Sequence, residues 1–169
     1  YFSEDPYLSG KMAAAYVRGI QENGIAACPK HFAVNSQELR RMASNSVLDE
    51  RTLRELYLTA FEIVVKEAHP KSIMSAYNKV NDTYANENHH LLVDILRKEW
   101  GFDGAVVTDW GGSNDHVEGV KNGSTLEMPS PGLGGARKLL KAVAEGSLTE
   151  QEIDLRVDEL LELVLSTTA

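Results

Sequence analysis

A carboxylate and an indole stand next to each other where a short apolar run of the sequence ends. The run Gly104–Thr108 contains three β-branched residues and is followed by Asp109, Trp110 and two glycines. Such a run is typical of a strand buried on both faces, and parallel α/β proteins place their chemistry at the carboxyl ends of such strands. A carboxylate beside an aromatic surface suits nucleophilic attack on a sugar. Asp109 could instead cap a helix in the loop after the strand.

Polar side chains also end the other runs that we expect to form strands. They are Lys30, His31, Tyr77, Asn78 and Glu127. Because parallel strands present their carboxyl ends at one edge of a sheet, we expect these groups to face the same cleft as Asp109. Lys and His side chains donate hydrogen bonds to hydroxyl groups, a Trp ring offers a stacking surface, and Asp supplies charge. The combination predicts a carbohydrate site.

Strands and helices that could hold these side chains alternate along the chain. Apolar runs predict strands over residues 25–32, 72–77, 104–109 and 124–128. Apolar spacing of three and four residues predicts helices over residues 9–22, 49–68, 88–101, 115–122, 133–145 and from 149 onward. This alternation indicates an α/β fold with a parallel sheet. A closed (β/α)8 barrel needs about 250 residues, so about four βα units form either an incomplete TIM-type barrel or a smaller open sheet.

The apolar residues of the first and last expected helices predict the face that each helix buries. Met12 and Tyr16 share one face of the first helix, and Val157 and Leu161 are expected to point inward from the last. Residues 78–86 are polar and are expected to form a turn region without strands.

Composition limits the classes of function. The chain has 169 residues and a formal net charge of −8 without a basic stripe, which disfavours nucleic acid and an anionic membrane surface as partners. No apolar run of the sequence approaches the roughly 20 residues that a membrane span needs. The single cysteine, Cys28, excludes an internal disulfide framework, and its apolar neighbours predict a buried thiol. No histidine has metal-ligand spacing, so neither a metal nor another cofactor is expected.

Five motifs together resemble glycoside hydrolase family 3 in its β-glucosidase branch. They are Tyr1–Tyr7 (YFSEDPY), Lys30–Asn35 (KHFAVN), Asp49–Glu55 (DERTLRE), Ser75–Asn81 (SAYNKVN) and Gly101–Gly104 (GFDG) running into Thr108–Trp110 (TDW). The N-acetylglucosaminidase branch carries a Gly-His-Gly-type segment after its Lys-His-Phe, whereas this chain has Ala-Val-Asn there. The resemblance implies that residues 1–169 are the C-terminal part of one incomplete (β/α)8 catalytic domain, with no second domain in this chain.

The resemblance implies hydrolysis of terminal non-reducing β-D-glucosyl residues, with retention, in a β-glucoside or a short β-linked oligosaccharide. Asp109 matches the catalytic nucleophile, which would form a glycosyl-enzyme ester. Lys30 and His31 match the pair that binds hydroxyls of the sugar in the −1 subsite. A retaining glycosidase also needs a second carboxyl about 5–5.5 Å from the nucleophile, as acid and then base.

Four further residues take their expected roles from the resemblance. Arg41 matches another sugar-contacting arginine, and Tyr77 matches the tyrosine near the nucleophile. Trp110 matches an aromatic residue beside the +1 subsite. Met74 is expected to line the pocket.

The acid/base residue has no match in this chain. In the resembled family it is usually a Glu of a following α/β sandwich domain, so that domain and the missing barrel segments are expected from a longer enzyme. Glu38, Asp115 and Glu127 are local candidates for a substitute, and each has a simpler interpretation as a loop, cap or strand-end residue. An open barrel segment also leaves helix faces uncovered, which predicts self-association.

Two other functions fit the same residues. Lys30 at a strand end could form a Schiff base, as in barrel aldolases, although a sugar-binding Lys beside a His explains the same pair. The chain could also be a non-catalytic sugar-binding or assembly subunit. The sequence does not separate glucose from xylose as the substrate. The compartment stays open, because a signal peptide would precede Tyr1, and one cysteine with an acidic composition favours a cytoplasm.

Overall fold

Two short parallel strands, β2 (Ser72–Met74) and β5 (Ala105–Val107), lie at the centre of the structure. The structure is a computed structural model that describes residues 2–167, so Tyr1 of the first family-like motif lies outside the described residues. The register pairs Ser72 with Ala105 and Met74 with Val107. Ile73 and Val106, the middle residues of the two strands, are fully buried, as expected for strands covered on both faces.

An extended segment flanks this pair on each side and runs parallel to it. The amide of Ser72 donates to the carbonyl of Ala27 (3.3 Å), and the amide of Thr108 donates to the carbonyl of Leu126 (2.9 Å). The segments 27–32 and 124–128 therefore occupy the places of the first and fourth predicted strands, although only isolated bridges form there. The predicted α/β class and the order of neighbouring parallel units in part of a barrel are confirmed.

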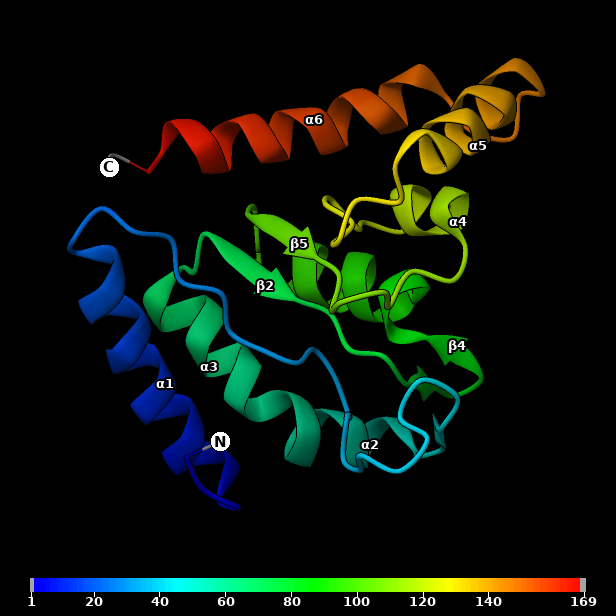
Figure 1. Cartoon of the computed structure of the whole chain (residues 1–169). Coiled ribbons are helices and arrows are strands. Elements are labelled where there is room, and N and C mark those ends of the chain that lie inside the picture. Colours follow the sequence, from blue (N-terminus) through cyan, green and yellow to red (C-terminus); the bar gives the residue numbers. More distant parts are fainter. Residues whose placement is uncertain (1, 168–169) are drawn as a thin grey trace.

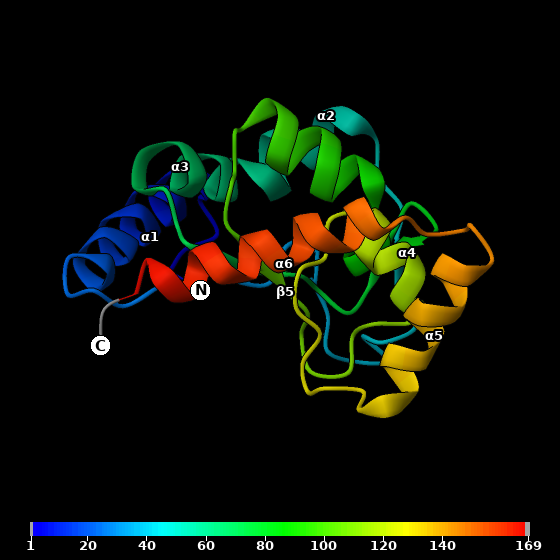
Figure 2. The ribbon, with the colours of Figure 1, turned by 90° about the horizontal axis from the view of Figure 1, so that it is seen from above.

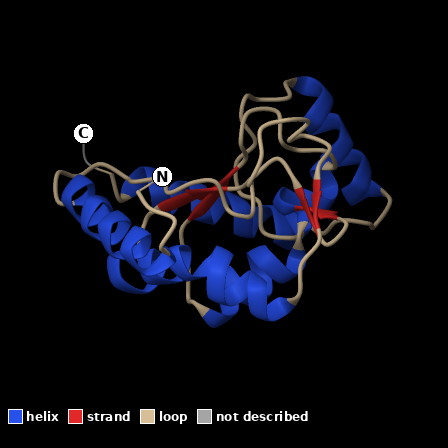
Figure 3. Cartoon of the chain, turned by 90° about the horizontal axis from the view of Figure 1, so that it is seen from below, coloured by secondary structure: helices blue, strands red, loops and turns tan. Residues whose placement is uncertain are grey.

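A second small sheet was missed by the sequence analysis, which expected only a turn region. It contains β1 (Asn45–Ser46), β3 (Lys79–Val80) and β4 (Thr83–Tyr84) in the order β1-β3-β4, with β1 parallel to β3 and β3 antiparallel to β4. Asn81 and Asp82 both have positive φ, which suits the two-residue turn of a hairpin. Figure 3 shows that this sheet lies apart from the β2–β5 pair.

The helices follow the predicted ranges with small shifts at their ends. They are α1 (Pro6–Gln21), α2 (Glu50–Thr52), η1 (Leu53–Leu58), α3 (Thr59–Ala68), η2 (Ala85–Glu87), η3 (His90–Glu99), α4 (His116–Lys121), α5 (Leu133–Ala144) and α6 (Glu150–Leu165). The predicted helix 49–68 is continuous through α2, η1 and α3, with a π-helical middle. Asp49 caps its start by accepting the amide of Thr52 (2.9 Å).

The face that α1 buries differs from the predicted one. Helices α1 and α3 lie side by side (Figure 1), and Gly10, Ala14 and Val17 line the side of α1 that is buried. A Cβ at Gly10 would stand 2.7 Å from the Ile63 side chain, so only small residues permit this approach. Tyr16 consequently points away and is 66% exposed, and Met12 is also exposed.

Helix α6 buries charged residues in place of the predicted Val157 and Leu161, which are exposed. Figures 1 and 2 show α6 passing over the strands, from the end that holds α4 and α5 toward α1. Its Glu159 lies 2.9 Å from the guanidinium of Arg97 in η3 and 3.0 Å from that of Arg156. A buried ion network thus attaches α6 to the sheet.

Thr125 connects this network to β5. Its hydroxyl donates to Glu159 (2.5 Å) and accepts the backbone amide of Val106 (3.0 Å). Arg97 also donates to the carbonyl of Gly123 (2.9 Å), so the segment before Thr125 is held as well. The periodicity of apolar residues carries no signal for contacts of this kind, which explains the wrong prediction for α6.

Cys28 is exposed, against the prediction of a buried thiol. Among the helices of residues 2–167, none is both long enough and apolar enough to cross a lipid bilayer.

We predict that Glu159→Ala lowers the free energy of unfolding by roughly 3–5 kcal/mol, because it leaves two buried guanidinium groups without their carboxylate. Urea denaturation followed by circular dichroism measures this loss. The control is Glu62→Ala, which removes an exposed pair with Lys66 and should cost less than about 1 kcal/mol. A similar small loss for both variants would contradict a stabilising role of the network.

We also predict that the 169-residue chain self-associates, because exposed apolar side chains line one face each of α1 and α6. Sedimentation velocity over a range of concentrations should show growth of the average mass. Replacing Val157 and Leu161 together by Lys should reduce it, whereas Leu140→Lys, on exposed α5, should have a smaller effect. A concentration-independent monomer would contradict the prediction.

Candidate functional site

Asp109 lies just beyond β5, at the carboxyl end of the central strand pair. It is 8% exposed. One carboxylate oxygen, Oδ1, accepts the amide of Trp110 (2.8 Å), which fixes the orientation of the group. The other oxygen, Oδ2, is buried and lies 3.3 Å from Nε2 of His31. One oxygen of the carboxylate is therefore held by the backbone, and the other faces the His31 ring.

His31 comes from the extended segment that pairs with β2. The next residue, Phe32, is fully buried, and its ring packs edge-on against Phe61 (5.2 Å between centroids) and Trp100 (5.9 Å). Burial lowers the pKa of the His31 imidazole, and the charge of Asp109 only partly opposes this effect. The neutral imidazole is consequently favoured at pH 7.

Tyr77 also interacts with Asp109. Its hydroxyl donates to the carbonyl of Trp110 (2.7 Å), and the residue is 6% exposed. Burial raises the pKa of the phenol, and the Asp109 carboxylate raises it further, so the hydroxyl stays protonated. The guanidinium of Arg41 stands 4.6 Å from the centre of the Tyr77 ring and pairs with Glu38 (2.8 Å).

The structure thus brings four of the seven residues predicted for the site into one linked group. They are Asp109, His31, Tyr77 and Arg41. The Lys30 side chain is exposed beside the group, where its charge helps to lower the pKa of His31. Trp110, the residue after Asp109, is 54% exposed. Met74, at the end of β2, is half-buried and makes no side-chain hydrogen bond.

The three candidate substitutes for the acid/base residue each have other contacts. Glu38 pairs with Arg41, and Asp115 caps α4 by accepting the amides of Val117 (2.9 Å) and Glu118 (3.1 Å). Glu127 forms an ion pair with His116, and burial raises the pKa of this carboxyl. The simpler interpretation of each residue therefore fits its surroundings.

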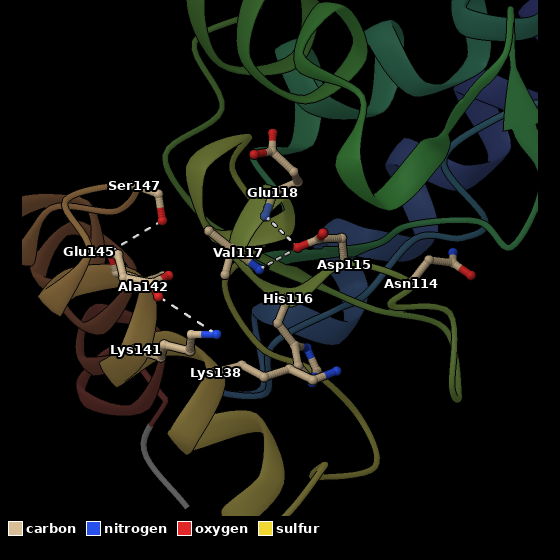
Figure 4. A pocket seen from close by; sticks show the side chains of 10 residues that line it. All are labelled: Asn114, Asp115, His116, Val117, Glu118, Lys138, Lys141, Ala142, Glu145 and Ser147. Atoms are coloured by element: carbon tan, nitrogen blue, oxygen red, sulfur yellow. Dashed lines mark hydrogen bonds and ion pairs between the residues drawn. The ribbon is translucent and has the colours of Figure 1, made fainter.

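A cleft of about 410 Å³ lies between α4 and α5, next to His116 (Figure 4). Its lining carries charges of both signs, including Glu118, Lys138 and Lys141. Asp109, His31 and Tyr77 are not among the residues that line it. The chemistry expected at the strand ends therefore belongs to a different surface from this cleft.

Glu87 is a residue of the site region that the sequence analysis missed. Its Oε1 accepts the backbone amides of Asn114 (2.8 Å) and Asp115 (2.6 Å), in the loop that leaves Asp109. The signal available in the sequence was the polar triplet 86–88 directly before a helix. Within residues 2–167, no cluster of three or more His, Cys, Asp or Glu side chains has an arrangement that could hold a metal ion.

Comparison with known proteins gives consistent similarities over almost the whole chain. The model of the glycosyl hydrolase family 3 N-terminal domain matches residues 1–163. The chain is 48% identical to thermostable β-glucosidase B of Acetivibrio thermocellus, over 97% of this chain and 22% of the relative. It is 41% identical to an exo-α-(1→6)-L-arabinopyranosidase of Bifidobacterium longum, over 100% of this chain and 22% of the relative.

Solved structures give the same result. The structure of β-glucosidase 3B from Thermotoga neapolitana in complex with glucose matches with a TM-score of 0.96 and 42% identity, over 99% of this chain and 24% of that chain. The β-glucosidase of Kluyveromyces marxianus in complex with glucose matches with a TM-score of 0.93 and 42% identity, over 98% of this chain and 20% of that one. The chain thus spans about a fifth to a quarter of the length of these relatives.

We predict that Asp109→Asn lowers the pKa of His31 further, because it removes the negative charge that favours the imidazolium. An NMR titration of the His31 ring measures its pKa in the unmutated protein and in the variant. In the unmutated protein, the pKa of His31 is lower in the folded state than the usual His value of about 6.5. The unfolded chain therefore binds the proton more readily, and the free energy of unfolding falls as the pH drops from about 6.5 to the folded-state pKa. An unchanged or raised pKa in the variant would contradict the contact between these side chains.

Proposed function

Because this chain belongs to glycosyl hydrolase family 3, we propose that it carries the nucleophile side of a retaining β-glucosidase site, with Asp109 as the nucleophile. The observation that carries the proposal is the buried, oriented carboxylate of Asp109, whose Oδ2 lies 3.3 Å from His31 at the carboxyl end of a parallel strand. Two uncharged groups, the Tyr77 phenol and the His31 imidazole, lie beside this carboxylate. Such a group suits attack on an anomeric carbon in a low-dielectric pocket.

The first chemical step would form a bond between a carboxylate oxygen of Asp109 and the anomeric carbon, while the bond from that carbon to the leaving oxygen breaks. The negative charge of the carboxylate is consumed as the ester forms. A second carboxyl group gives its proton to the leaving oxygen, and later takes one from the water that hydrolyses the ester. The anomeric configuration is retained because two displacements occur.

The second carboxyl is proposed to come from a part of the protein outside this sequence, together with further barrel segments and an α/β sandwich domain. The contacts of the local candidates support this. Asp115 is committed to the cap of α4, and Glu127 to its ion pair with His116. Glu38 is bound to Arg41. Any of them would have to give up its contact to act as a proton donor.

The remaining side chains are proposed to bind the sugar. Lys30, His31 and Arg41 can donate hydrogen bonds to hydroxyl groups in the −1 subsite, and half-buried Met74 can line its wall. The exposed ring of Trp110 can stack on the group that leaves. Glucose is the favoured sugar because relatives named β-glucosidase match the chain, and both solved structures described above are complexes with glucose. The arabinopyranosidase relative supplies the competing substrate for the test.

Neither alternative function gains support from a specific contact. Lys30 is exposed, whereas Schiff-base lysines are typically activated in desolvated surroundings or beside another cation. A non-catalytic sugar-binding role would require no oriented nucleophile, and it would leave sugar binding unaffected by Asp109→Asn.

We predict that the full-length protein forms a covalent adduct with 2-deoxy-2-fluoro-β-glucosyl fluoride. Fluoride leaves with little help from an acid, so the reagent isolates the first step. Mass spectrometry of peptides should locate the added sugar on Asp109. Asp109→Asn should form no adduct, and it should lose on the order of 10³-fold or more of the hydrolysis of aryl β-glucosides.

The control variant is Glu118→Gln, an exposed carboxylate of α4 that pairs with Lys121. It should be labelled at the unmutated rate. The absence of an adduct on folded protein, or an adduct on another residue, would contradict the assignment of Asp109. Faster hydrolysis of aryl α-L-arabinopyranosides than of β-glucosides would keep the nucleophile and change the sugar.

A further inference from the structure

The loop Trp110–Asp115 connects β5 to α4 and carries the indole that follows the proposed nucleophile. Three contacts hold its backbone. The Tyr77 hydroxyl donates to the carbonyl of Trp110 (2.7 Å), and the amide of Gly111 donates to the carbonyl of Met128 (3.0 Å). At the far end, Glu87 accepts two backbone amides. The carboxylate of Glu87 is the one charged group among these three contacts.

A single carboxylate oxygen of Glu87 accepts two backbone amides of the loop. Oε1 accepts the amide of Asn114 at 2.8 Å and that of Asp115 at 2.6 Å. Hydrogen bonds to an ionised acceptor are roughly twice as strong as neutral ones, and two donors on one oxygen fix the direction of both peptide groups. Asn114 also donates from its side chain to the carbonyl of Gly112 (3.2 Å), which passes the constraint back along the loop toward Trp110.

Glu87 is itself held in place by its two neighbours in the sequence. The buried side-chain oxygen of Asn86 accepts the hydroxyls of Ser75 (2.8 Å) and Ser124 (3.1 Å), one from each side of β5. The side chain of Asn88 caps η3 by accepting the amide of Leu91 (3.1 Å). Segment η2 is therefore fixed to the sheet and to a helix, and Glu87 extends this fixed point to the loop.

The near end of the loop leaves little freedom for the backbone that carries the indole. A Cβ at Gly112 would stand 3.0 Å from the carbonyl oxygen of Asp109 and 3.4 Å from the Tyr77 ring. The amide of Gly112 donates to that same carbonyl (2.8 Å). The loop is thus closely packed at the nucleophile and anchored at Glu87, with Trp110 at its start.

We propose that Glu87 is a positioning residue that sets the place of the Trp110 indole relative to Asp109, and so determines binding of the leaving group and of acceptor alcohols. This inference rests on the proposed function. Glu87 acts through the loop and does not touch the sugar. Its removal therefore changes the steps that use Trp110 and spares the attack of Asp109 on a substrate that lacks an aglycone.

The experiment is a double-mutant cycle with Glu87→Ala and Trp110→Ala in the protein at its natural length. For an aryl β-glucoside, Glu87→Ala should lower kcat/KM about tenfold, mainly through KM, when Trp110 is present. In the Trp110→Ala background the same change should have less than about a twofold effect. Labelling of Asp109 by 2-deoxy-2-fluoro-β-glucosyl fluoride should stay within about twofold, because fluoride makes no contact with an indole.

Two further variants keep the test independent of folding. Glu87→Gln retains a neutral acceptor oxygen, so its loss of kcat/KM should be smaller than that of Glu87→Ala and should depend on Trp110 in the same way. The matched control is Glu152→Ala. The carboxylate of Glu152 also accepts a backbone amide, that of Thr149 (2.8 Å), at the start of α6. This variant should affect thermal stability and leave KM unchanged.

Equal losses with and without Trp110 would overturn the inference, and so would parallel loss of labelling in Glu87→Gln. Both results would make Glu87 a residue that stabilises the fold only. Failure of the unmutated protein to label Asp109 would refute the proposed function itself. The two kinds of failure are therefore distinguished by the unmutated protein.

Discussion

The parallel register of β2 and β5 determines where Tyr77 and Asp109 of the candidate site lie. Met74 pairs with Val107, so the chain leaves both strands at the same edge, with Tyr77 on one side and Asp109 on the other. The segment before His31 joins the same edge through the amide of Met74, which donates to the carbonyl of Pro29 (3.0 Å). The site is thus a consequence of strand direction, and a shift in pairing would separate His31 from Asp109.

The elements around this pair are held by two different kinds of contact. Small side chains let α1 approach α3, and a buried carboxylate, Glu159, joins α6 to Arg97 and Thr125. Amphipathic spacing indicates that a helix has an apolar face, but it does not say which neighbour covers that face. This is why the extents of α1 and α6 follow from the sequence and their buried faces do not.

The candidate site could be predicted to the extent that its residues end strands. Asp109, His31 and Tyr77 follow apolar runs, so the topology alone brings them together. Glu87 ends no strand, and its role depends on two backbone amides that are 27 and 28 residues away in the sequence. The hairpin at Asn81 was missed for a related reason, because its strands are only two residues long.

The charge states around Asp109 favour its use as a nucleophile. Burial lowers the pKa of His31 and raises that of Tyr77, so both neighbours are uncharged at pH 7. Attack on a sugar consumes the negative charge of the carboxylate, and a permanent cation bonded to it would resist that change. The backbone amide of Trp110 orients the carboxylate without such a cation. The formal cations Lys30 and Arg41 stay more exposed, where they can meet hydroxyl groups without binding the carboxylate.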